Sequence, residues 1–118
     1  MMREMLQGKL HRGAVTDTRL DYPGSLTVDP VLYERAGMRE FQKIQLLNLT
    51  NGNRLETYVI RGEPGKGEII VNGAAARLAY KGDRVIVAAF AFYDEKELAG
   101  HKPLVLVLNE RNQVVETH

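Results

Sequence analysis

The sequence predicts a single mainly-β domain, a small β-barrel decorated with short helices. Short apolar segments alternate with turn residues along the whole chain, and helix signals are confined to brief stretches. The chain has 118 residues, of which 44% are hydrophobic and 26% charged, which is enough to bury one core without disulfides. We find no internal repeat, linker or low-complexity segment, so we expect residues 1–118 to form one domain.

The first expected strands come early in the chain. Residues 5–12 alternate, with apolar side chains on one face and Lys9 and His11 on the other. The short apolar segments at residues 14–17 and 26–28 are the next expected strands. A turn must join these two segments, because proline, glycine and serine lie between them.

A brief helix and a hairpin follow. Asp29 suits an N-cap, the proline after it suits the first helical position, and Gly37 lies where a helix commonly ends. Residues 43–50 form the next expected strand. It ends at Asn51-Gly52, a dipeptide that favours a hairpin turn, so residues 54–60 are expected to return beside it.

The middle of the chain continues the same pattern. A glycine-rich loop at residues 62–67 precedes an expected strand at residues 68–71. Asn72 is a candidate N-cap for a short helix, because alanines follow it. A turn at residues 81–83 leads into residues 84–93, whose long apolar run is typical of a strand buried on both faces.

The last part of the chain holds a helix and a hairpin. Asp94 to Glu97 has the capping-box pattern, so these carboxylates are interpreted as a cap of a short helix that ends at Gly100, and not as a catalytic pair. Residues 104–108 and 113–116 are expected to close the fold as a hairpin around the turn between them.

Composition excludes several classes of function. The absence of cysteine removes disulfides, thiol nucleophiles and thiolate metal sites, and His11, His101 and His118 show no metal-ligand spacing. A net charge of +1 and 7% aromatic residues count against a nucleic-acid partner. No apolar run has the length of a signal peptide or a membrane span, so we expect a cytoplasmic protein without a membrane partner.

The turn Tyr22–Ser25 becomes informative in combination with other segments. By itself, Pro-Gly-Ser is an ordinary turn sequence. Three further segments accompany it in a fixed order, at residues 6–12, 51–58 and 71–76. In sequence and spacing, the chain resembles the pyruvoyl-dependent aspartate 1-decarboxylase family from about residue 3 to about residue 110.

This resemblance implies a fold, an activity and an assembly. The fold would be a six-stranded double-psi β-barrel with short capping helices. The activity would be decarboxylation of L-aspartate to β-alanine and CO₂ for pantothenate biosynthesis. The family forms homotetramers with sites between adjacent subunits, uses neither metal nor pyridoxal phosphate, and in some members needs a maturation factor for processing.

The resemblance also implies a cofactor made from the chain itself. Loss of CO₂ leaves a carbanion, and no standard side chain carries a ketone that could accept its electrons. In this family the Ser25 hydroxyl would attack the Gly24 carbonyl, and elimination and hydrolysis would leave a pyruvoyl group at position 25, which forms a Schiff base with aspartate. The cut would give chains 1–24 and 25–118. Gly24 suits such a turn because it reaches backbone conformations closed to other residues.

Site roles are carried over by the same resemblance. Tyr58 resembles the proton donor to the carbanion, and Thr57 resembles a residue that stabilises the oxyanion during self-cleavage. Arg54 is the candidate for binding a substrate carboxylate through its guanidinium. The other expected substrate-binding or supporting residues are Lys9, His11, Thr57, Asn72, Gly73, Ala74, Ala75 and Tyr22.

Alternatives remain open for these residues. Arg54 also suits a solvated hairpin charge, Tyr58 a packing residue, and the alanines plain helix filler. On a regular strand Arg54 and Tyr58 share a face whereas Thr57 points the other way, so one site needs either a bulge or a second subunit. For the whole chain, the alternatives are a non-catalytic small β-barrel binding module and an uncleaved relative of the family.

Overall fold

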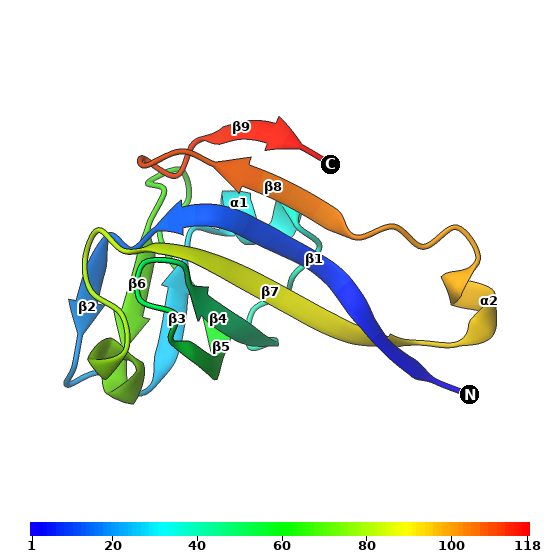
Figure 1. The fold of residues 1–118 in the computed structure, drawn as a ribbon, viewed down its shortest axis with the longest axis horizontal. Coiled ribbons are helices and arrows are strands. Elements are labelled where there is room, and N and C mark those ends of the chain that lie inside the picture. Colours follow the sequence, from blue (N-terminus) through cyan, green and yellow to red (C-terminus); the bar gives the residue numbers. More distant parts are fainter.

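The computed structural model describes all residues, 1–118, and confirms the mainly-β prediction (Figure 1). Nine strands form one sheet in the order β2-β6-β3-β5-β4-β7-β1-β8-β9. The strands are β1 (Arg3–Ala14), β2 (Asp17–Arg19), β3 (Ser25–Val28), β4 (Lys43–Asn48), β5 (Arg54–Arg61), β6 (Ile69–Asn72), β7 (Arg84–Tyr93), β8 (Leu104–Leu108) and β9 (Val114–Thr117). The helices are α1 (Pro30–Arg35), the 3₁₀-helix η1 (Gly73–Arg77) and α2 (Glu95–Leu98). None of them is long and apolar enough to cross a membrane.

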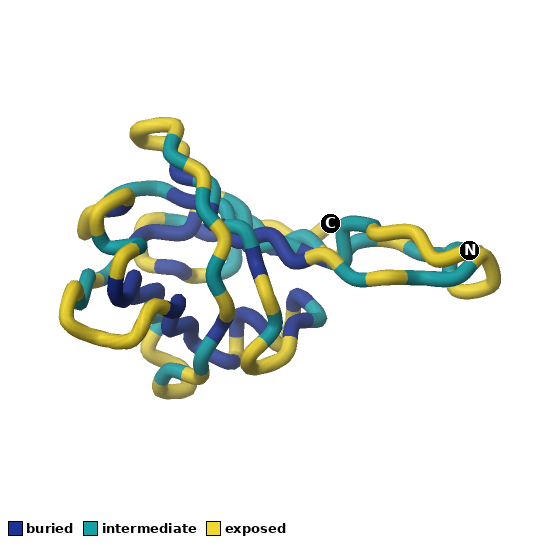
Figure 2. The backbone as a smooth tube through the Cα atoms, turned by 90° about the horizontal axis from the view of Figure 1, so that it is seen from below, coloured by how far each residue is buried: buried dark blue, intermediate teal, exposed yellow.

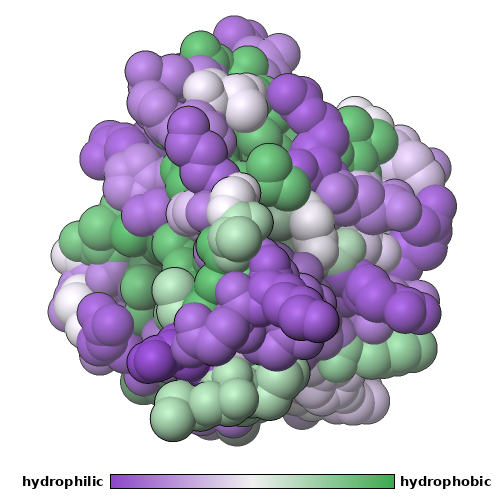
Figure 3. All heavy atoms as spheres, turned by 90° about the vertical axis from the view of Figure 1, so that its right-hand side faces the viewer, coloured by the Kyte–Doolittle hydropathy of each residue, from purple (hydrophilic) through white to green (hydrophobic).

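Strands β1 and β7 form a long arm. They pair antiparallel from Arg3↔Tyr93 to Ala14↔Arg84, and β8 pairs parallel with the middle of β1. The arm reaches away from the body towards the N-terminus and α2 (Figures 1 and 2). Buried residues gather in the body, whereas the far part of the arm is half-buried or exposed (Figure 2). Seen from the arm's end, polar and apolar residues are interleaved over the surface (Figure 3).

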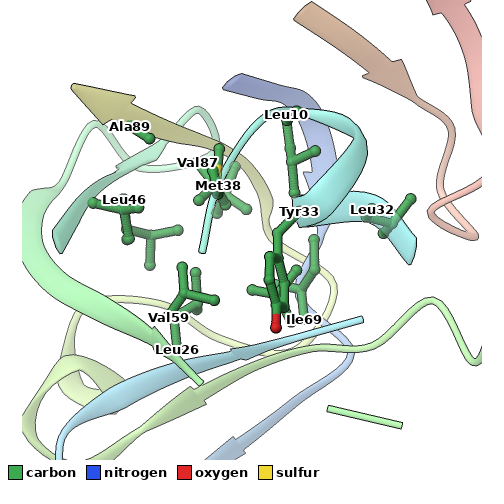
Figure 4. Packing of buried hydrophobic residues seen from close by; sticks show 14 of the residues in the cluster. Leu10, Leu26, Leu32, Tyr33, Met38, Leu46, Val59, Ile69, Val87 and Ala89 are labelled. Carbon is green, nitrogen blue, oxygen red and sulfur yellow. The ribbon is translucent and has the colours of Figure 1, made fainter. Parts of the chain in front are cut away.

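One hydrophobic core of 19 buried residues fills the body. Tyr33 reaches from α1 into this core, which also contains Ile69 of β6 (Figure 4). The helix begins and ends as predicted: the Asp29 carboxylate accepts a hydrogen bond from the Val31 backbone N–H at 2.9 Å, and Gly37 has a φ of +80° after the last turn. The cap sets where α1 begins, and the buried residues of the helix, Pro30, Leu32 and Tyr33, pack on the core.

Several other predicted elements are confirmed. The β4–β5 hairpin forms, with its last strand pair at Leu47↔Arg54 and Gly52 in the left-handed region. Both hydrogen bonds of the α2 capping box are present: the Asp94 carboxylate accepts from the Glu97 backbone N–H, and the Glu97 carboxylate accepts from the Asp94 backbone N–H. Strand β7 has the predicted bounds, but it is buried on both faces only in its middle, because Phe90 and Phe92 are exposed.

The expected strand at residues 14–17 is wrong. Strand β1 continues to Ala14, and the chain then changes partners before β2 begins. The Val15 N–H donates to the Asp83 carbonyl at 2.9 Å, whereas the Thr16 N–H donates to the Ile69 carbonyl at 2.8 Å. Hydrogen bonds to two different segments on successive residues end one strand and start the next.

Strand β3 lies between two neighbours that position the site. It pairs antiparallel with β6, where Ser25 faces Asn72, and parallel with β5, where Leu26 faces Val59. These pairs bring the turn before β3, the end of β6 and the middle of β5 together, although they are far apart in the sequence.

Candidate active site

Ser25 begins β3 and is buried, with only 2% of its surface exposed. Its hydroxyl donates to the Pro23 carbonyl at 3.0 Å, and no basic side chain hydrogen-bonds to it. Gly24, directly before it, is exposed. The site therefore places a buried hydroxyl directly after an exposed glycine.

The glycine that this turn requires is Gly73 and not Gly24. Gly24 does not adopt a positive φ, and a Cβ added to it would meet nothing within 4 Å, so the expected special backbone conformation is absent. Gly73 has a φ of +69°, and an added Cβ would lie 2.6 Å from the Gly24 Cα and 2.8 Å from the Tyr22 carbonyl oxygen. The start of η1 thus packs directly against the backbone of the turn.

Asn72 occupies the N-cap position of η1, but its side chain makes no cap hydrogen bond, contrary to the expectation. Its amide nitrogen instead donates to Ser25 Oγ at 3.1 Å and to Thr27 Oγ1 at 2.9 Å. The side chain is completely buried, and its Oδ1 has no hydrogen-bond partner. Sequence reasoning missed Thr27, although its position two residues after Ser25 on a strand places both hydroxyls on one face.

A cavity of about 380 Å³ opens beside Gly24. We call it the Gly24 cleft. Its other lining residues are Leu55, Glu56, Thr57, Tyr58, Ala74, Ala75 and Leu78. Tyr58 is 38% exposed, so its phenol can meet both the cleft and solvent. The structure thus gathers Gly24, Thr57, Tyr58 and the two alanines around one space.

Strand β5 carries no bulge beside this cleft. Its register with β4 is continuous from Tyr58 to Arg54, and its register with β3 is continuous as well. Exposure alternates along the strand, with Arg54 and Tyr58 exposed and Thr57 half-buried. Arg54 and Tyr58 therefore share one face and Thr57 points to the other. Thr57 and Tyr58 nevertheless line the same cleft of one chain, so the expectation that they need a bulge or a second subunit is wrong, and only Arg54 lies outside the cleft.

Lys9, His11 and Arg54 lie elsewhere on the sheet. Lys9 faces Ala88, Ala88 faces Gln45, and Gln45 faces Glu56, so these side chains point to the same side. Alternation along each strand adds the others to this surface. We call it the outer face; it includes Lys9, His11, Arg54, Glu56 and Tyr58. Within one chain, only Glu56 and Tyr58 of this set also line the Gly24 cleft.

His11 has an unusual environment on the outer face. Its Nδ1 is buried without a hydrogen-bond partner. Burial lowers the pKa of this imidazole below its ordinary value, and the charges of Lys9 and Arg12 lower it further. The neutral form of His11 is therefore favoured, and Lys9 and Arg54 carry the positive charge of the outer face.

Three asparagine side chains donate hydrogen bonds to the backbone of Leu78, a residue that lines the Gly24 cleft. The Leu78 carbonyl accepts hydrogen bonds from the side chains of Asn48 at 3.3 Å, Asn51 at 3.2 Å and Asn53 at 3.1 Å. Asn48 also donates to Asp83 at 2.8 Å. These bonds tie the segment after η1 to the β4–β5 loop. Sequence reasoning gave a turn role to Asn51 alone and placed Asn48 in a strand.

Comparison with known proteins adds a family to this geometry. A family model described as aspartate decarboxylase matches residues 1–115. Aspartate 1-decarboxylase from Sulfurimonas denitrificans is 51% identical over 98% of this chain and 96% of its own length. The enzymes of that name from Ralstonia nicotianae and Bacillus subtilis are each 47% identical, over 98% and 97% of this chain and 97% and 90% of their own lengths.

Proposed function

The chain belongs to the aspartate decarboxylase family, and we propose that it removes the α-carboxyl group of L-aspartate to give CO₂ and β-alanine for pantothenate biosynthesis. The observation that carries this proposal is the buried hydroxyl of Ser25 at the start of β3, next to a cleft lined by Thr57 and Tyr58. Parallel strand neighbours such as β3 and β5, which a simple meander lacks, support the family's six-stranded double-psi barrel as the architecture.

The proposed catalytic group is a pyruvoyl made from Ser25. The Ser25 oxygen attacks the Gly24 carbonyl carbon, the peptide C–N bond breaks, and an ester forms. Elimination then breaks the Cβ–Oγ bond of residue 25 and leaves a carboxylate on Gly24. Hydrolysis of the resulting dehydroalanine releases ammonia and leaves a ketone. The products are chains 1–24 and 25–118, and the ketone supplies the electron sink that decarboxylation needs.

The surroundings of position 25 fit this group. Because Gly73 has no Cβ, the Gly24 backbone can pack directly against it. Gly24 is also exposed to solvent. The Asn72 amide nitrogen lies within hydrogen-bond distance of the Ser25 side chain and would hold an oxygen there. Thr57 lines the cleft beside Gly24, where a hydroxyl can stabilise the oxyanion of the cleavage step.

The remaining roles divide between two surfaces. Tyr58 holds a phenolic proton at the Gly24 cleft, which suits a proton donor. Arg54 and Lys9, on the outer face, carry the positive charges that bind carboxylates, and His11 lies beside them. Because the two basic residues do not line the cleft of their own chain, we propose that the outer face of one copy completes the cleft of the next in a homotetramer.

The test compares the wild-type protein with Ser25→Ala. Under denaturing conditions, the wild type should give two polypeptides in a mass spectrum, and Ser25→Ala one intact chain without decarboxylase activity. Borohydride added with aspartate should increase the mass of chain 25–118 only. An active wild type with an ordinary amino terminus on every polypeptide would refute the proposal, as would normal turnover by Ser25→Ala. A single intact chain without activity is instead the result expected of a binding module.

A further inference from the structure

The Thr27 side chain is linked to the candidate active site by a hydrogen bond with Asn72. Its Oγ1 accepts a hydrogen bond from Asn72 Nδ2 at 2.9 Å, and it does not line the Gly24 cleft. Thr27 is buried, with 8% of its surface exposed, and Asn72 is buried completely. The resemblance to the family gave Thr27 no role, so its polar contact inside the site needs a separate explanation.

The hydrogen bonds fix which end of the Asn72 carboxamide faces residue 25. The Ser25 hydroxyl gives its one proton to the Pro23 carbonyl, so its oxygen can only accept from Asn72. The amino end of Asn72 therefore faces Ser25, and its second N–H goes to Thr27. With the carboxamide turned over, Oδ1 would face Ser25 Oγ, which has no second proton to donate, so this hydrogen bond would be lost.

The rotamer of Thr27 is fixed in turn. A Cβ added to Gly62 would lie 3.1 Å from the Thr27 methyl carbon, so this methyl group packs against the bare glycine. With the methyl held there, the hydroxyl is directed to Asn72. A chain of fixed groups thus runs from Gly62 through Thr27 and Asn72 to Ser25.

We propose that Thr27 is a positioning residue, whose hydroxyl holds the Asn72 amino group towards position 25 both before and after self-cleavage. This inference rests on the proposed function. Before the cut, the amino group restrains Ser25 Oγ beside the Gly24 carbonyl. The cut removes that oxygen from residue 25, but it leaves the Thr27–Asn72 hydrogen bond intact. One N–H of Asn72 then stays directed at position 25, free to donate to an oxygen there.

Two substitutions at Thr27 and one control test the proposal. Thr27→Val keeps the shape and removes the hydroxyl, whereas Thr27→Ser keeps the hydroxyl and removes the methyl. Thr16→Val is the matched control, because the Thr16 hydroxyl also bonds inside the fold, to the Ile69 backbone at 3.1 Å and 3.0 Å, away from Asn72. Circular dichroism checks folding, and Thr27→Ala replaces Thr27→Val if the valine variant does not fold.

The first measurement is the rate at which freshly made chain is cut, followed by mass spectrometry. Thr27→Val should be cut about 5- to 50-fold more slowly, since it leaves a buried N–H without a partner. Thr27→Ser should stay within about twofold of the wild type, because the hydroxyl is retained. The second measurement is the turnover of the fully cut fraction, in which Thr27→Val should lower kcat while KM changes by less than about twofold.

Three results would contradict the role of Thr27, and a fourth would contradict the proposed function. Wild-type cleavage and kcat in Thr27→Val would overturn the proposal, and so would a serine variant as slow as the valine variant. Equal slowing by Thr16→Val would show a general loss of stability and would also overturn it. If the wild type itself remains one uncut chain, the proposed function fails, and this result is separate from any effect at Thr27.

Discussion

Two regions of the molecule are built in opposite ways. The cleavage turn, residues Tyr22–Ser25 with Asn72 and Gly73, is held by buried hydrogen bonds and by close packing of backbone against backbone. The outer face carries exposed or half-buried side chains such as Arg54 and Lys9 on neighbouring parts of the sheet. The first region depends on geometry within one chain, whereas the second depends on charge that is accessible to other molecules.

This difference separates two kinds of chemistry. The proposed cleavage would use atoms of Gly24 and Ser25, which the hydrogen bonds of one chain hold next to each other. Substrate binding needs positive charge near the cleft, and in one chain that charge lies on another surface. We therefore expect substitutions in the turn to stop maturation, and substitutions on the outer face to weaken aspartate binding while maturation continues.

The largest effect should follow from Gly73→Ala. The new Cβ would meet the Gly24 backbone at 2.6 Å, and alanine would have to adopt a φ of +69°. Overpacking and the left-handed conformation together should lower the free energy of unfolding by about 2–4 kcal/mol and prevent the cut. Urea unfolding and mass spectrometry measure the two effects. Gly24→Ala is the control and should fold normally, because an added Cβ there meets nothing within 4 Å.

Arg54→Ala tests the other region. Charge-assisted hydrogen bonds contribute about 1.5–3 kcal/mol, so KM for aspartate should rise about 10- to 100-fold. The rate of self-cleavage should not change, because Arg54 does not line the Gly24 cleft. Arg61→Ala, an exposed arginine at the other end of β5, is the matched control and should leave KM unaltered. An unchanged KM in Arg54→Ala would remove this residue from carboxylate binding.

The smallest effect concerns the pH dependence of stability through His11. Its folded pKa lies below the ordinary 6.5, so the unfolded chain takes up a proton first as the pH falls. The folded state therefore loses stability below pH 6.5 and keeps it above that value. His11→Gln should flatten this loss in urea unfolding measured between pH 7 and about pH 5. His118→Gln, at the exposed C-terminus, should leave the loss unchanged.

Local chemistry made much of the fold predictable. Asp29 and Asp94 cap helices that begin where the sequence indicates, and the Asn51-Gly52 dipeptide marks a hairpin that forms. In each case the contacts that decide the structure lie within a few residues of one another. The break after Ala14 could not be predicted in this way, because it depends on hydrogen bonds to Asp83 and Ile69 far along the chain.

The sequence predicted which residues belong to the candidate site better than it predicted how they are arranged. The resemblance to the family indicated Ser25, Thr57, Tyr58 and Asn72, which lie on three neighbouring segments in the structure. Propensity made Asn72 a helix cap, but a serine and a threonine from another strand compete for its amide. Likewise, the need for glycine at position 73 follows from the closeness of Gly24, a contact that no local pattern encodes.

The pairing of β1 has a consequence for the finished protein. If the bond after Gly24 is cut as proposed, the short piece still spans β1, which is held between β7 and β8 along the arm. The two pieces then form a heterodimer whose partners were once a single polymer. After full denaturation they must find each other by diffusion, so recovery should become second order in protein and slow on dilution. An uncut Ser25→Ala chain has no such requirement and should regain its fold by a unimolecular route.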